Sequence, residues 1–162
     1  MATLEELVSR KVLEPIAVQL GRGEFYDRKI YGTPEFKNWL NTDVKMAKPF
    51  YSDSSAPAKQ AFSLIKHFIS GKAMRGSRLF QRMSPSGDDV WELRSDPDLR
   101  FFGWFPKVDT FVAVKGDFFG PLKADPSLYE KHRLTVIQYR KEIDLDEPQY
   151  LPGAGEEDVV SE

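Results

Sequence analysis

The stretch Asp89–Gly116, DVWELRSDPDLRFFGWFPKVDTFVAVKG, decides the fold class because it holds three strand-like runs at short spacing. The turn-rich segments 95–98 and 106–109 join these runs, a pattern typical of an antiparallel meander. Alternate side chains of a strand point to opposite faces. The middle run therefore places two sets on opposite faces: Leu99, Phe101, Gly103 and Phe105 against Arg100, Phe102 and Trp104. An arginine beside two large aromatic side chains suits a face that holds phosphate and stacks a base.

Helical patterns surround this meander. Capping residues open helices at Thr3 and Thr33, and the clearest helical spacing runs from Pro57 to Ile69. A strand is expected over 25–31, a loop over 41–57, and a last helix from Asp125–Pro126 to about Lys141. The sequence thus predicts an α+β fold: a small antiparallel-dominated sheet with helices packed mainly on one face, plus an N-terminal helix and an acidic C-terminal tail.

Charge and length divide the chain into three parts. We expect an N-terminal helical extension over 1–24, one α+β domain over 25–146, and an acidic, disordered tail over 147–162. Eight acidic residues follow Lys141 without a Lys or Arg, so residues 1–141 carry a net charge of +6, against −2 for the chain. A basic body suits a nucleic-acid or ribosome surface, whereas the tail could simply confer solubility.

Composition argues against several classes of protein. The chain has no cysteine, and its two histidines are 65 positions apart, which predicts no metal site and no disulfide framework. It has no dinucleotide or phosphate-loop fingerprint, so no cofactor is expected. No apolar run has the length of a membrane span, and the N-terminus lacks a secretory h-region, which favours a cytoplasmic protein.

The element order, together with FYDRKIYGTPEFKNWL (25–40) and the residues of 89–115, resembles the bacterial RelE/HigB-like toxins of type II toxin–antitoxin systems, in the RelE/ParE superfamily. The Glu-Leu-Arg of 92–94 and the Leu-Arg of 99–100 carry much of the resemblance, which covers residues 25–145. Such toxins are typically mRNA interferases, small endoribonucleases that cut messenger RNA, in many cases at the ribosome, without a metal. The resemblance implies a RelE-like fold, translation inhibition, and messenger RNA, the ribosome and a cognate antitoxin as partners.

The same resemblance implies a set of site residues. It places catalytic groups at Arg94, Arg100, Tyr129 and His132. RNA-binding residues are expected in the basic segment before the sheet, on the meander, and after its last strand: Lys72, Arg75, Arg78, Arg82, Phe102, Trp104, Lys115 and Lys123.

Each assignment has a structural alternative. The two catalytic arginines could pair with Glu92, Asp96 or Asp98, and His132 could be an ordinary helix-surface residue. Phe102 and Trp104 could belong to the core, and the basic segment could be a solvated edge.

The chain also departs from the family pattern, because it is longer at both ends and less basic than strong RNA cutters. The alternative function is therefore a non-catalytic RelE-fold protein-binding module of phage or mobile-element origin.

Overall fold

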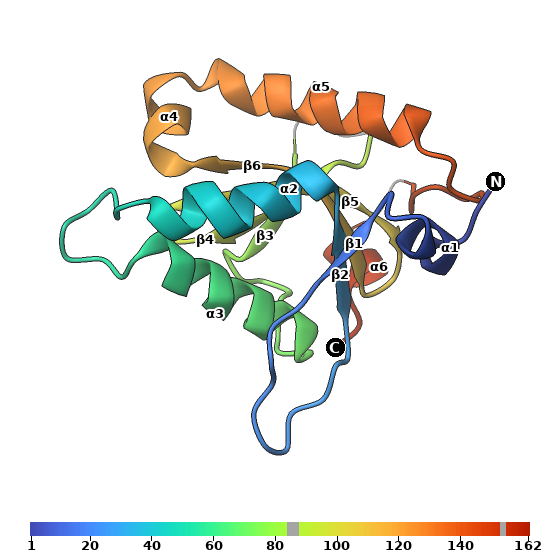
Figure 1. Cartoon of the computed structure of the whole chain (residues 1–162), viewed down its shortest axis with the longest axis horizontal. Coiled ribbons are helices and arrows are strands. Elements are labelled where there is room, and N and C mark those ends of the chain that lie inside the picture. The colour runs from blue at the N-terminus through green and yellow to red at the C-terminus, as the bar shows by residue number, and fades with distance from the viewer. Residues whose placement is uncertain (84–87, 153–154) are drawn as a thin grey trace.

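The computed structural model describes residues 1–83, 88–152 and 155–162, and its centre is a six-stranded mixed sheet. The strands are β1 Glu14–Ile16, β2 Lys29–Gly32, β3 Phe80–Arg82, β4 Trp91–Ser95, β5 Leu99–Lys107 and β6 Thr110–Phe118. They lie in the order β1–β2–β6–β5–β4–β3, with β2 parallel to β6 and the other neighbours antiparallel (Figure 1). The predicted meander is confirmed as β4, β5 and β6, and the chain is an α+β protein.

The first face of the sheet packs against α2 (Pro34–Trp39), the π-helical turn η1 (Leu40–Val44) and α3 (Pro57–Ile69). The Thr33 hydroxyl accepts a hydrogen bond from Phe36 N at 3.1 Å, which caps α2 as the sequence predicts. The core on this face is built from large apolar side chains, among them Phe36, Ile65, Phe68, Trp91, Leu93, Phe101, Phe105 and Phe111. Both predicted helices of this region are therefore confirmed.

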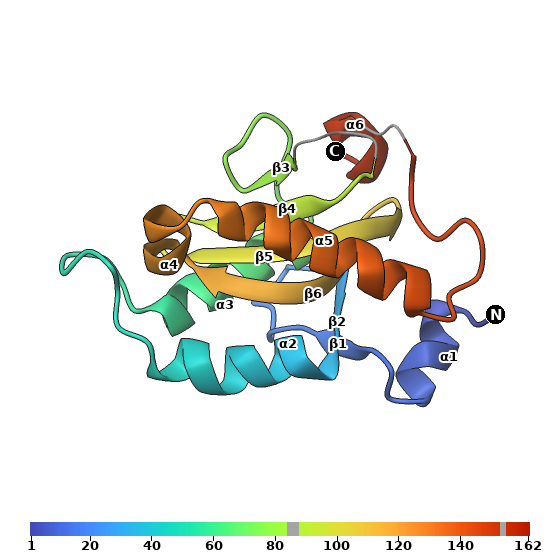
Figure 2. The same cartoon turned by 90° about the horizontal axis from the view of Figure 1, so that it is seen from above.

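The second face is covered by α5 (Ser127–Glu142), with α4 (Phe119–Ala124) at one end and α1 (Leu4–Ser9) at the other (Figures 1 and 2). Helices thus lie on both faces, whereas the sequence predicted that they pack mainly on one. The reason lies in α5, which buries His132, Arg133 and Arg140 beside Val136 and so shows little hydrophobic periodicity.

The N-terminal segment contains a shorter helix than predicted and an additional strand. The Thr3 hydroxyl accepts a hydrogen bond from Glu6 N at 3.1 Å and starts α1, which ends at Ser9. Pro15 lies in β1 at the edge of the sheet, where a missing N–H is tolerated. Because Leu7 and Leu13 are buried and β1 pairs with β2, residues 1–24 belong to the common sheet and core rather than to a separate extension.

The C-terminal segment is packed rather than disordered in this structure. It forms α6 (Glu156–Val159), and Val159 and Val160 are fully buried in the core of the first face. The Glu162 carboxylate accepts hydrogen bonds from Met74 N and Arg75 N, and the Arg75 guanidinium donates to Val160 O at 2.9 Å. The acidic composition concealed this docking, because the apolar residues that anchor it, among them Leu151, Val159 and Val160, stand between acidic ones.

Candidate functional site

A cluster of charged side chains occupies the second face of the sheet, near α4 and the start of α5. We define this charged cluster as Glu92, Arg94, Arg100, Asp117 and His132. Antiparallel register brings its members together, since Arg94 pairs with Arg100 across β4 and β5, and Arg100 pairs with Asp117 across β5 and β6. The two paired arginines therefore lie beside three side chains that can gain or lose a proton.

Burial makes the cluster energetically unusual. Arg100 is 3% exposed, and its Nη1 donates to Leu99 O at 2.8 Å and to Ser95 O at 3.0 Å. Arg94 is the more accessible arginine, with 26% of its side chain exposed, and its Nε lies 3.7 Å from Glu92 Oε1. Among the described residues, three buried side-chain atoms have no hydrogen-bond partner, and all three belong to this cluster: Glu92 Oε2, Arg94 Nε and Arg100 Nε. Buried polar atoms without a partner are rare in folded proteins, and a functional role is one of the explanations for them.

Glu92 lies among both arginines. Burial raises the pKa of its carboxyl, and the positive charges of Arg94 and Arg100 oppose that rise. A carboxyl group with a raised pKa beside two phosphate-binding candidates is a feature of functional sites.

His132 approaches the cluster from α5. Its Nε2 lies 2.7 Å from Asp117 Oδ2, and its ring contacts Phe102 at a centroid distance of 5.1 Å. Burial acts to raise the pKa of Asp117, but hydrogen bonds from His132 and Phe118 N outweigh it, so the pKa lies below its ordinary value. Tyr129 packs edge-on against the same Phe102 ring at 6.1 Å, so the structure brings the four predicted catalytic residues to one region.

The predicted basic segment divides into two parts. Arg78 and Arg82 line a groove of about 420 Å³ along β3, and Arg94 lines the same groove, which links it to the charged cluster. Lys72 and Arg75 lie elsewhere, because Lys72 is an exposed residue 4.0 Å from Glu24 and Arg75 holds the C-terminal segment. Only half of this segment therefore adjoins the site.

The predicted stacking residues Phe102 and Trp104 are fully buried, so neither ring is open to a base in this structure. Both lie beneath α5, and Trp104 Nε1 donates to Gln149 O at 2.7 Å. The alternative that they belong to the core describes them correctly. Lys115 and Lys123 are exposed, and the charge of Lys115 acts on Asp117.

Sequence reasoning named Glu92 only as a possible ion-pair partner of the arginines, a pairing that the structure shows with Arg94, and it gave Asp117 no role. Strand alternation could have found Glu92, because residues 92 and 94 share a face. Asp117 could be found only from the β5–β6 register, which includes an irregularity between Phe102 and Gly103. Because such an irregularity shifts the alternation of side chains, counting residues along the sequence did not show which face of the sheet Asp117 would occupy.

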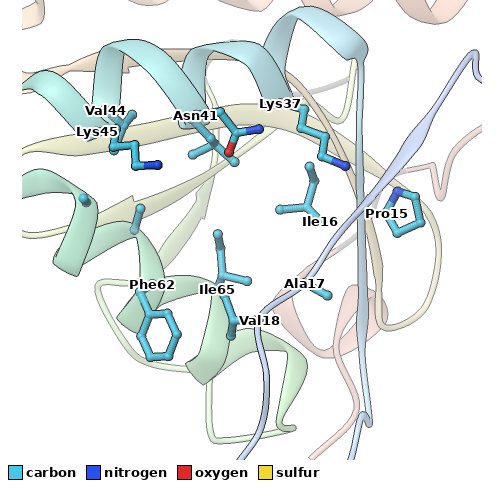
Figure 3. Close-up of a pocket in the computed structure, with 13 residues that line it drawn as sticks. Pro15, Ile16, Ala17, Val18, Lys37, Asn41, Val44, Lys45, Phe62 and Ile65 are labelled. Carbon is cyan, nitrogen blue, oxygen red and sulfur yellow. The ribbon is translucent and has the colours of Figure 1, made fainter.

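A second cavity lies on the opposite side of the sheet and contains no predicted site residue. It has a volume of about 320 Å³ between β1, α2 and α3, and Figure 3 shows Ile16 and Ile65 directed into it, with Lys37 and Lys45 at its margin. Its lining is mainly aliphatic, so it offers no acid–base group comparable to the charged cluster.

Within residues 1–83, 88–152 and 155–162, no group of three His, Cys, Asp or Glu side chains could hold a metal ion. No helix in the same part of the chain is long and apolar enough to cross a membrane. Comparison of the whole sequence and structure with family models, curated proteins and solved structures finds no match.

Proposed function

We propose that this protein is a RelE/HigB-like toxin: an endoribonuclease that cleaves messenger RNA at the ribosome and so inhibits translation in the cytoplasm. The observation that carries the proposal is the cross-strand pair Arg94–Arg100 beside the His132–Asp117 hydrogen bond. The observed order of β2, α2, α3, β4, β5, β6 and α5 also agrees with the order on which the family resemblance rests.

The chemistry of RNA self-cleavage suits these groups. The ribose 2′-oxygen attacks the adjacent phosphorus and the bond to the 5′-oxygen breaks, which leaves a 2′,3′-cyclic phosphate and a 5′-hydroxyl. One group must accept the 2′-proton and another must donate a proton to the leaving oxygen. Arg94 and Arg100 would stabilise the charge on the pentacoordinate phosphorus, and His132 and Tyr129 would transfer the protons. A positioned electrostatic contact of this kind contributes about 10²–10³-fold to rate.

Expression in bacterial cells, with mapping of RNA 5′ ends, tests the proposal. The wild-type chain should arrest growth and create new 5′ ends within coding regions. Arg100→Ala and Arg94→Ala should abolish both effects, while Arg22→Ala, which removes an exposed charge in the segment between β1 and β2, should not. Growth and messages unaffected by wild-type protein that accumulates in folded form would refute the nuclease.

One observation favours a second function. Arg100 and His132 are only 3% and 5% exposed, so α4 and α5 cover much of the acid–base chemistry. A RelE-fold module that binds a protein partner without cleaving RNA would not need these side chains to be exposed. Unimpaired growth together with a stable partner complex would support that function.

A further inference from the structure

A group of aromatic side chains lies at the α4 end of the charged cluster. We define this aromatic platform as Phe50, Tyr51 and Phe119. The Phe50 ring lies 4.9 Å from Tyr51 and 5.1 Å from Phe119, with both pairs near edge-on. Phe50 and Tyr51 are 47% and 44% exposed, and they come from the loop that projects at the same end of the molecule as α4 (Figures 1 and 2). Large aromatic rings left this open indicate a binding surface.

The platform is anchored to the sheet rather than loosely attached. The buried Asp98 carboxylate accepts a hydrogen bond from Phe50 N at 2.9 Å, and Asp98 O accepts one from Phe119 N at 2.8 Å. The Gln60 side chain donates to the same carboxylate at 2.6 Å. One residue at the β4–β5 turn therefore positions both aromatic segments.

Positive charge borders the platform. The Arg100 guanidinium lies 5.8 Å from the Phe119 ring centroid, and Lys123 Nζ lies 5.7 Å from the centroids of both Phe119 and Phe50. A ligand with a flat aromatic group joined to a phosphate would satisfy both features at once. Single-stranded nucleic acid has this chemistry, because its bases stack on aromatic side chains while its phosphates pair with cations.

We propose that the aromatic platform is a nucleobase subsite for single-stranded RNA whose adjoining phosphate is held by the exposed Lys123, while the buried Arg100 adds positive charge beside Phe119. The inference rests on the proposed function for its ligand class, and it assigns base stacking to Phe50 and Tyr51 instead of the buried Phe102 and Trp104. It requires no movement of the core, since these rings already face solvent.

Binding of a short fluorescein-labelled 2′-O-methyl oligoribonucleotide, followed by anisotropy, tests the proposal without depending on cleavage. The 2′-O-methyl group blocks the attacking oxygen, so binding is measured whether or not the protein is a nuclease. Phe50→Ala and Tyr51→Ala should each weaken binding about tenfold, because stacking contributes that order of affinity per base. Phe62→Ala is the matched control, since Phe62 is 46% exposed on α3. Its affinity should equal that of the wild type.

An abasic oligomer provides the second arm. Wild-type protein should bind it about tenfold more weakly than the base-containing oligomer, whereas Phe50→Ala should bind both alike. Equal affinity of Phe50→Ala, Tyr51→Ala and the wild type, or no binding by the wild type, would overturn the subsite. Cleavage in cells with unchanged binding in these variants would retain the nuclease and refute the subsite. Base-dependent binding without cleavage would support the subsite and refute the nuclease.

Discussion

The two faces of the sheet are closed in different ways. The face beneath α2 and α3 is packed with side chains such as Leu93 and Phe101, whereas the face beneath α5 is apolar around Trp104 and charged around Arg94 and Arg100. Burying charge costs several kcal/mol per ion unless pairing is complete, and apolar residues could close this face equally well. The difference teaches that the charged half closes the sheet at a higher electrostatic cost than the apolar half, and this cost is what singles it out as the candidate site.

The largest expected effect tests the apolar face. Phe101→Ala should lower the free energy of unfolding by about 3–5 kcal/mol, because it removes a fully buried ring and leaves a cavity. Urea denaturation measures this change. Phe25→Ala is the control, since Phe25 is 73% exposed and its loss should change stability by less than about 0.5 kcal/mol. Similar effects of the two substitutions would contradict the assignment of the core.

A second prediction asks whether the C-terminal segment belongs to that apolar face. Val160→Ala should cost roughly 1–3 kcal/mol in urea denaturation, because Val160 is fully buried. An unchanged unfolding midpoint would show instead that the segment is disordered in solution, as its acidic composition suggested.

On the charged face, Asp117→Asn should cost about 1–2 kcal/mol at neutral pH, because it weakens the hydrogen bond with His132. Since the folded pKa of Asp117 lies below the ordinary value of 3.8, its stabilisation is fully present above pH 3.8 and is lost as pH falls through the folded pKa. The difference in free energy of unfolding between the wild type and Asp117→Asn should shrink as the pH is lowered through the acidic range. A difference independent of pH would contradict the lowered pKa.

Glu92→Gln should change stability with the opposite pH dependence. Because burial raises the folded pKa of Glu92 above 4.5, folding favours the protonated carboxyl. The associated stability is present below pH 4.5 and is lost as pH rises through the folded pKa. The wild type should thus lose stability relative to Glu92→Gln as pH rises above 4.5. If the stability of the wild type instead rose relative to that of Glu92→Gln with rising pH, the positive charges of Arg94 and Arg100 would outweigh the effect of burial on the pKa of Glu92.

Local signals in the sequence predicted much of the fold. The capping residues Thr3 and Thr33 start helices where expected, and the alternation along 99–105 correctly placed Arg100, Phe102 and Trp104 on one face. These features depend on neighbouring residues, which the sequence shows directly. The expected helical extension over 1–24 is wrong at Pro15, which lies in the edge strand β1, because an edge strand and a broken helix tolerate proline equally well.

The sequence could not show what covers each face. Burial of Phe102 depends on the path of α5, whose polar residues conceal its inner side. The aromatic platform depends on contact between the loop residue Phe50 and Phe119 of α4, which are 69 positions apart. The sequence could therefore place the two arginines of the candidate site together, because they belong to adjacent strands of the meander. It could not place Asp117 and Phe50 beside them, because their contacts depend on register and on residues distant in sequence.

The most direct test of the proposed role of the charged face compares two neighbouring residues that point to opposite sides of β4. Leu93→Met and Arg94→Met make the same replacement on the apolar and the charged face, and Leu93→Met should cost less than about 1.5 kcal/mol. Each purified protein would be added to a reconstituted translation reaction, with primer extension on the messenger. We predict discrete cleavage by the wild type and by Leu93→Met, and about a hundredfold less by Arg94→Met. An intact messenger with folded wild-type protein, or equal cleavage by Arg94→Met, would contradict the account.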